Sequence, residues 1–174
     1  ALLVSLSLVF PVHAQKLKVV GTNSDLAALA SQIGGDLVDV SSLVPSQMEP
    51  HAMPMRPSLI QKVREARVLI TIGLDHEPWL FDVVTSAGNG RVTQGGAGYV
   101  DVSGGIQLQQ IPGGVVDRSR GDLHIFGNTH YWMDPRNGKI MAVHILQALT
   151  RELPDQKEAL RGRCRELLAD LDKR

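Results

Sequence analysis

The sequence predicts an α/β fold: an open, mostly parallel four-stranded sheet flanked by helices, followed by a long linker helix that is cut short. Two observations lead to this prediction. Segments typical of strands alternate with segments typical of amphipathic helices, which is the order expected of helices packed on a sheet. The strand segments are also continuous apolar runs, such as RVLITIG at residues 67–73, and such runs fit a parallel sheet covered on both faces.

The first part of the chain reads as strands followed by helices. KLKVVGT at residues 16–22 has β-branched residues at its centre and predicts a strand, and a helix is expected at residues 24–33. Asn23 or Ser24 is expected to cap this helix, and the glycine pair after it suits a C-cap. The next expected elements are a strand at residues 36–44, a helix at 58–66, a strand at 67–73 and a helix at 77–87.

Residues 88–122 are rich in glycine and predict turns and a long loop, apart from a short fourth strand at residues 99–102. Their glycines form neither G-x-G-x-x-G nor G-x-x-x-x-G-K-[ST], so no phosphate-binding motif supports nucleotide binding. A loop of this length is either functional or an irregular connection, and the sequence leaves both alternatives open.

The end of the chain is expected to be helical. From Asn137 onward, apolar residues recur at three-residue steps until Pro154 interrupts the pattern: Ile140, Val143, Leu146 and Leu149. A highly charged helix then begins at Asp155, and its apolar stripe needs another element to pack on: Leu160, Leu167, Leu168 and Leu171. No C-cap signal precedes Arg174, so we expect this helix to continue beyond the sequence given.

The first 14 residues, ALLVSLSLVFPVHA, resemble the apolar and cleavage regions of a partial secretory signal peptide. The apolar run of about ten residues is too short for a transmembrane helix, which takes about 20. Cleavage is expected after Ala14, and the alternative is a buried first strand or helix. We therefore expect a periplasmic or otherwise extracytoplasmic protein, with membrane association left open. The lone Cys164 can form no internal disulfide, and its charged neighbours give it no expected redox role.

Charge excludes one class of partner. The chain has 18 basic and 18 acidic residues, and this balance gives no support to a nucleic-acid-binding surface, which normally appears as a basic excess. No nucleic-acid partner is therefore expected.

The candidate ligands for a metal are histidines in loops. The six histidines form no H-E-x-x-H motif, so a metal site has to be assembled from distant segments, and the carboxyl ends of strands are the place to look. His51 follows the second expected strand, and Pro50 stiffens the loop that presents it. His130 stands where a loop meets a helix, with Asp134 as the expected N-cap. Taken alone, a loop histidine such as His51 is more often simply solvated, and the aromatic residues next to His130 fit the core equally well.

Two further residues are weaker candidates. His76 follows the third expected strand and faces the same sheet edge, although a plain turn histidine explains it as well. Glu49 is placed to orient His51 as a supporting acid or to accept the metal itself. His124 and His144 have weaker cases, and His13 belongs to the expected signal peptide.

Two of these segments resemble the histidine motifs of a known family. Glu49-Pro50-His51 after a strand, and His130-Tyr131-Trp132-Met133-Asp134-Pro135 before a helix, are similar to the D/E-P-H and H-x-W-x-D-P motifs of the periplasmic metal-binding proteins of zinc and manganese ABC importers, the cluster A-I solute-binding proteins. VVGTNSDLAALASQIGGDLVDVSSLVP resembles the opening strand, helix and strand of that family, and ARVLITIGLDHEPWL its third strand and following turn. The resemblance extends from about Lys16 to Arg174.

The resemblance implies a domain plan and a ligand set. Residues 15–150 would be the N-terminal metal-binding lobe, residues 151–174 the start of the helix that joins two lobes, and the second lobe would be missing. His51 and His130 would be two of four protein ligands, with the other two supplied by the second lobe. His76 is not a standard ligand of the family and would be an extra or replacement ligand. This segment would then hold half of a site and bind metal weakly or not at all.

The function implied is capture of a divalent transition metal, zinc or manganese, and its delivery to an ABC permease in the cytoplasmic membrane, without catalysis. The histidine-rich loop of zinc-specific members is absent, because residues 103–123 contain no histidine, so the metal stays open. One alternative is a metal-dependent hydrolase in which Glu49 or Glu77 serves as the base. A metal-binding adhesin is another, and it is compatible with transport.

Overall fold

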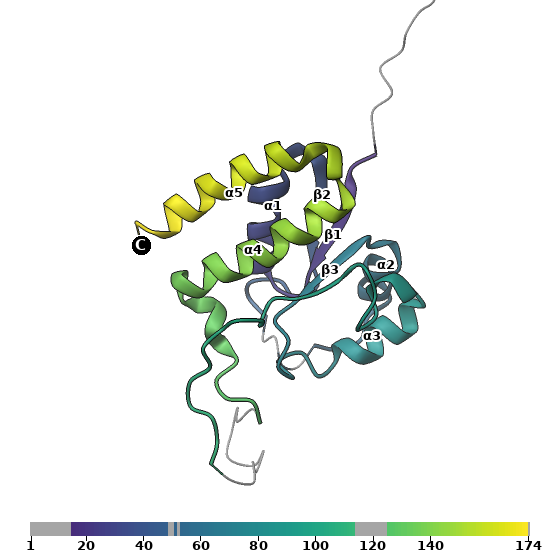
Figure 1. The fold of residues 1–174 in the computed structure, drawn as a ribbon. Coiled ribbons are helices and arrows are strands. Elements are labelled where there is room, and N and C mark those ends of the chain that lie inside the picture. Colours follow the sequence, from purple (N-terminus) through teal and green to yellow (C-terminus); the bar gives the residue numbers. More distant parts are fainter. Residues whose placement is uncertain (1–14, 49–50, 52, 114–124, 174) are drawn as a thin grey trace, which may run out of the picture.

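The computed structural model describes residues 15–48, 51, 53–113 and 125–173. Four parallel strands form one sheet in the order β2-β1-β3-β4 (Figure 1). Their bounds are Leu17–Gly21 for β1, Val38–Ser42 for β2, Val68–Thr71 for β3 and Tyr99–Asp101 for β4. The predicted α/β fold with a four-stranded parallel sheet is confirmed.

The strand order reverses at β1, because β2 lies on one side of it and β3 on the other. Since parallel crossovers are right-handed, this reversal places the helices that follow β1 and β2 on opposite faces of the sheet. Accordingly, α1 (Ser24–Gly34) packs on one face and α2 (Pro57–Glu65) on the other. Ligands of such sheets bind outside the carboxyl ends of the strands at the point of reversal.

The helices complete two layers around the sheet (Figure 1). On the α1 face lie also α4 (Pro135–Glu152) and α5 (Lys157–Leu171), whereas α3 (Leu80–Ala87) joins α2 on the opposite face. Short 3-10 helices in the described residues connect these elements: η1 (Gly35–Leu37), η2 (Gly90–Val92), η4 (His130–Met133) and η5 (Pro154–Gln156). None of the helices in the described part of the chain has the length and apolar character needed to cross a membrane.

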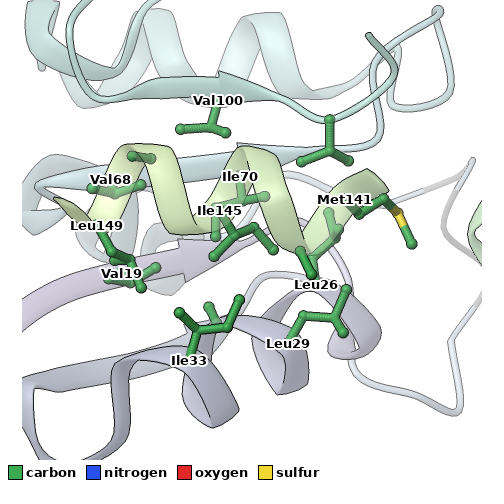
Figure 2. Close-up of a cluster of buried hydrophobic side chains, with 14 of the residues drawn as sticks. Val19, Leu26, Leu29, Ile33, Val68, Ile70, Val100, Met141, Ile145 and Leu149 are labelled. Atoms are coloured by element: carbon green, nitrogen blue, oxygen red, sulfur yellow. The ribbon is translucent and has the colours of Figure 1, made fainter. Parts of the chain in front are cut away.

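Alternate residues of the strands pack into two hydrophobic cores, one on each face of the sheet. Val19 is buried against the α1 face and Val20 against the α2 face, because successive strand side chains point to opposite sides of a sheet. In Figure 2, Ile33 of α1 and Ile145 of α4 converge on Val19 and neighbouring strand residues. Both faces of β3 are buried, which explains its uninterrupted apolar sequence.

The apolar stripe predicted for the last helix does find elements to pack on. Leu160 and Leu167 are buried together with Cys164, and α5 packs against α1 and α4. Arg163 adds a polar clasp: its guanidinium donates to the carbonyl oxygens of Ile33 and Gly34, at 2.7 and 3.0 Å. These carbonyls lie in the last turn of α1, where backbone acceptors have no partner within the helix.

Two details differ from the sequence predictions. The helix expected at residues 77–87 begins only at Leu80, because the chain first makes a turn that buries His76 and Glu77. In α4 the buried face runs through Met141, Ile145 and Leu149, whereas Val143 is 41% exposed. Three-residue steps drift around a helix of about 3.6 residues per turn, so they do not define one face over the roughly two and a half turns from Ile140 to Leu149.

Some predictions concern residues outside the described part of the chain. These are the signal peptide at residues 1–14, Glu49 with Pro50, and His124. The predicted cap of the first helix is confirmed, because the Asn23 side chain accepts a hydrogen bond from the Leu26 amide at 2.9 Å.

Candidate metal site

Three histidines that are far apart in the sequence meet at the carboxyl edge of the sheet. His51 follows β2, His76 stands in the turn after β3, and His130 begins η4 just before α4. Their ring centroids are 4.3 Å apart for His51 and His76, 5.3 Å for His51 and His130, and 5.5 Å for His76 and His130. One ring nitrogen of each lies within 4.8 Å of the others. The structure thus brings together all three histidines that the sequence singled out for this edge.

Hydrogen bonds fix the orientation of two of these rings. Nδ1 of His51 lies 3.0 Å from the carbonyl oxygen of His76. Nδ1 of His130 lies 3.2 Å from the Asn128 side-chain oxygen, which also accepts from the His130 amide at 2.9 Å. Carbonyl oxygens only accept, so Nδ1 carries the proton in both rings and Nε2 carries the lone pair.

The two Nε2 atoms of His51 and His130 are 3.3 Å apart. With both protons on Nδ1, two lone pairs face each other at this distance, and a cation or a proton between them is needed to make the approach favourable. Two nitrogens that each lie about 2.0–2.1 Å from a tetrahedral zinc ion are roughly 3.3 Å apart. The spacing therefore matches one edge of a zinc coordination tetrahedron.

His76 is the most deeply placed of the three, with 1% of its surface exposed. Its Nδ1 lies 2.9 Å from the hydroxyl oxygen of Thr129, which is fully buried. The indole of Trp132 stands 4.5 Å from the His76 ring and 5.1 Å from the His130 ring, measured between centroids. This aromatic wall lowers the local dielectric constant, which strengthens electrostatic attraction between a cation and its ligands.

An unusual turn presents His76. Gly73, Leu74 and Asp75 all have positive φ angles, of 74°, 56° and 60°, and the His76 amide donates to the Gly73 carbonyl at 3.0 Å. Left-handed conformations are rare for residues other than glycine and cost of order 1–3 kcal/mol each. Such strain persists only where the surrounding structure holds it, and it is most common at functional sites.

Glu77 holds this turn. Its buried carboxylate accepts hydrogen bonds from the amides of Ile72 and Gly73, at 2.9 and 3.2 Å, and from the hydroxyls of Thr71 and Thr22. Burial raises the pKa of Glu77, whereas these hydrogen bonds act in the opposite direction. The residue joins the ends of β1 and β3 directly behind His76. Sequence reasoning considered Glu77 only as the start of a helix or as a base, because its partners are distant in the chain.

The remaining candidates lie apart from the cluster or have other roles. Asp134 caps α4 as predicted, because its side chain accepts from the Arg136 amide at 2.8 Å. His144 lies on α4 and its Nε2 bonds to the Gly104 carbonyl oxygen at 2.8 Å. Glu49 and His124 belong to the residues outside the description.

Together, a parallel α/β fold and three histidines gathered at the carboxyl edge of its sheet define a class: α/β proteins with a candidate metal site at the sheet edge. Within that class, residues 19–174 match the family model of ZnuA, the periplasmic component A of the zinc-uptake complex. The chain therefore belongs to this family, and the resemblance inferred from its two histidine motifs is confirmed.

Curated proteins that are similar to this chain include substrate-binding lipoproteins of metal ABC transporters. The manganese ABC transporter substrate-binding lipoprotein PsaA of Streptococcus pneumoniae serotype 4 is 31% identical over 163 residues, which are 91% of this chain and 49% of PsaA. The iron ABC transporter substrate-binding lipoprotein MtsA of Streptococcus pyogenes serotype M1 is 29% identical over 164 residues, which are 92% of this chain and 49% of MtsA. The chain thus spans about half the length of the curated relatives it matches.

Solved structures show the same fold. A crystal structure of ZnuA superposes with a TM-score of 0.73 and 25% identity, covering 91% of this chain and 56% of that one. A ZnuA deletion mutant with zinc bound gives a TM-score of 0.75 and 26% identity, covering 91% and 55%. The descriptions of these proteins name manganese, iron or zinc. They are consistent with a transition metal as the ligand but do not identify which one.

Proposed function

We propose that this chain is the N-terminal lobe of an extracytoplasmic solute-binding protein that captures a divalent transition metal through His51 and His130 and delivers it to an ABC permease. The observation that carries the proposal is the pair of Nε2 atoms held 3.3 Å apart by hydrogen bonds on the opposite side of each ring. The descriptions of the relatives support the same reading. In the proposed whole protein, residues 15–150 form this lobe, residues 151–174 begin the connecting helix, and a second lobe follows.

Binding in this scheme is an exchange of ligands on the ion. Neutral imidazoles replace water molecules, and the hydrogen bonds at Nδ1 hold the rings and make Nε2 a better donor to the metal. No proton transfer or bond cleavage is needed, so we propose no enzymatic activity. Export follows from the same role, with residues 1–14 as part of a signal peptide and the mature chain in the periplasm or at the outer surface of the membrane.

The alternative of a metal-dependent hydrolase has less support. Of its two candidate bases, Glu77 is buried and both of its carboxylate oxygens already accept hydrogen bonds from the turn and from two threonines. A base must reach a water molecule or substrate proton, and Glu77 is engaged elsewhere. The adhesin reading is compatible with metal capture and adds no separate site.

The test is calorimetric titration of the chain with zinc and with manganese, before and after the double substitution His51→Ala plus His130→Ala. We expect the double variant to lose binding, while the control His144→Ala, which removes a histidine outside the cluster, keeps it. The same pair of titrations on a version completed with a second lobe tests whether affinity increases there. Unchanged binding by the double variant in both forms would reject this proposal.

A further inference from the structure

We infer that His76 is a third metal ligand, so that three imidazoles from this one lobe hold the ion and the site prefers zinc to manganese. The inference rests on the proposed function, because it assigns a further ligand and a metal to the same site. It changes the count of ligands from two to three, and it concerns a residue for which the sequence also allowed a plain turn histidine.

The His76 ring lies next to the rings of His51 and His130. Its centroid is 4.3 Å from that of His51 and 5.5 Å from that of His130, so the three rings enclose one small space. Nδ1 of His76 lies 2.9 Å from the Thr129 hydroxyl oxygen, and one ring nitrogen of each histidine lies within 4.8 Å of the others, so we assign Nε2 as the ligand atom of His76. All three rings then have the same arrangement, with an oxygen at Nδ1 and Nε2 toward the ion.

The turn that carries His76 is strained and is held by a buried carboxylate. An ordinary turn histidine needs neither a run of left-handed residues nor a buried carboxylate that accepts four hydrogen bonds. Here both features stand directly next to one imidazole and fix its backbone. Backbone strain maintained in this way is evidence of function when it is observed first and interpreted second.

His76 also orients His51. The carbonyl oxygen of His76 accepts the hydrogen bond from Nδ1 of His51. One residue therefore offers its side chain to the ion and its backbone to the neighbouring ligand. Any displacement of the turn would move two of the three imidazoles together, which ties the site to the end of β3.

The chemistry of the donors then selects the metal. Imidazole nitrogen suits zinc, whereas manganese favours carboxylate, carbonyl and water oxygens, and the general order of divalent affinities also places zinc far above manganese. Three histidines with a fourth position open are a recurrent coordination pattern of zinc. With three ligands in place, we expect the 174-residue chain to bind zinc without a second lobe.

The deciding variant is His76→Asn, because asparagine keeps a polar atom near the position of Nδ1, within reach of Thr129, but removes Nε2. We expect its zinc affinity to fall about 100-fold or more, beyond the usual 10–100-fold effect of losing a supporting residue. Manganese affinity is expected to change by less than about tenfold, because a single imidazole contributes little to an oxygen-preferring ion. His144→Asn is the matched control and should bind zinc as the unchanged chain does.

The outcomes separate this inference from the proposed function. If His51→Asn and His130→Asn abolish zinc binding while His76→Asn does not, the third ligand is rejected and the proposed function stands. Absence of zinc binding by the unchanged chain, together with binding by the form completed with a second lobe, would also reject the one-lobe site. If none of the three variants affects binding, both ideas fail. Visible spectra of the cobalt-substituted chain give a second readout, because intense bands indicate four-coordination and should weaken in His76→Asn.

Discussion

At the scale of single residues, the candidate site depends on groups other than its three histidines. His51 and His130 were predictable as a pair, because each belongs to a short motif at the end of a strand or before a helix. Thr129 and Glu77 were not, because their roles come from contacts across the fold: Thr129 bonds to a histidine 53 positions away, and Glu77 to a threonine 55 positions away. No local pattern encodes such contacts.

Glu77 provides the first prediction. In Glu77→Gln an NH2 group replaces one carboxylate oxygen. This NH2 group cannot accept the hydrogen bonds that the oxygen accepted. We expect the free energy of unfolding to fall by about 1–3 kcal/mol, the usual cost of leaving buried polar groups unsatisfied. Zinc affinity should fall about 10–100-fold, because the turn that carries His76 is no longer held. Urea unfolding and zinc titration measure the two effects.

The matched control is Glu65→Gln, which changes the same atoms at a side chain that is 42% exposed. It should leave zinc affinity unchanged. A Glu77→Gln chain with the zinc affinity of the unchanged protein would show that the turn needs no carboxylate to position His76.

A second prediction concerns Tyr131 and pH. Its hydroxyl donates to the Ile72 carbonyl oxygen, and burial raises the pKa of this phenol above its ordinary value. The folded chain therefore keeps the proton at a pH where the unfolded chain, with a pKa of about 10, loses it. The contribution of Tyr131 to stability is complete below about pH 10 and is lost as the pH rises further.

Tyr131→Phe should remove this dependence. We expect the free energy of unfolding of the variant, measured with urea in the presence of a chelator, to fall less than that of the unchanged chain between about pH 9 and pH 11. At neutral pH the variant should be less stable by about 1 kcal/mol, because one buried hydrogen bond is missing. Parallel pH profiles of the two proteins would contradict this account.

At the scale of elements, the clasp formed by Arg163 connects α5 to α1, two helices that are far apart in the sequence. The order and type of the helices and strands followed from apolar periodicity and from caps such as Asn23. The later start of α3 did not, because it depends on the buried turn before it. The hydrogen bond from Arg163 to α1 could not be predicted from the sequence either. A charged residue on a highly charged helix does not indicate which carbonyl group it will bind.

Arg163→Ala tests this clasp. Two carbonyl oxygens at the end of α1 lose a charged donor, so we expect a loss of about 1.5–3 kcal/mol in the free energy of unfolding. The lone Cys164 reports on the same contact, because it is 2% exposed and burial raises the pKa of its thiol. Reaction with a thiol reagent needs the exposed thiolate, so labelling should be slow in the unchanged chain and faster in the variant.

Arg161→Ala serves as the control for the clasp, because Arg161 is half exposed and pairs only locally with Glu158 among the ion pairs described. Its labelling rate should match that of the unchanged chain. Equal rates in Arg163→Ala would mean that apolar packing alone keeps α5 on α1.

At the scale of the whole molecule, the site is a product of topology. The three histidines come from loops after β2, after β3 and before α4, and the loops that follow the strands meet at one edge because all the strands of the sheet are parallel. The sequence predicted that edge from the α/β pattern and from the general rule for such sheets. The distances between the rings required the complete fold, because packing on both faces of the sheet sets them.

Metal binding should therefore stabilise the folded chain as a whole. Unfolding separates the three histidines, so an ion that binds the folded state shifts the equilibrium by about 2.7 kcal/mol at a free concentration 100 times its Kd. We expect zinc to raise the Tm measured by calorimetry or circular dichroism, and a chelator to reverse the change. The double variant His51→Ala plus His130→Ala should show no rise, and a rise equal to that of the unchanged chain would place the ion elsewhere.

The hydrogen bonds at Nδ1 of the three rings have one more consequence, which concerns signalling. A site whose rings already stand in the binding orientation needs little reorganisation when an ion arrives. Capture can then be fast, and the shape of this lobe changes little between the empty and the loaded state. A ligand shifts a conformational equilibrium only through interactions that differ between its states. In the proposed two-lobed protein, capture of an ion would therefore change how this chain is seated against the second lobe more than it changes the chain itself.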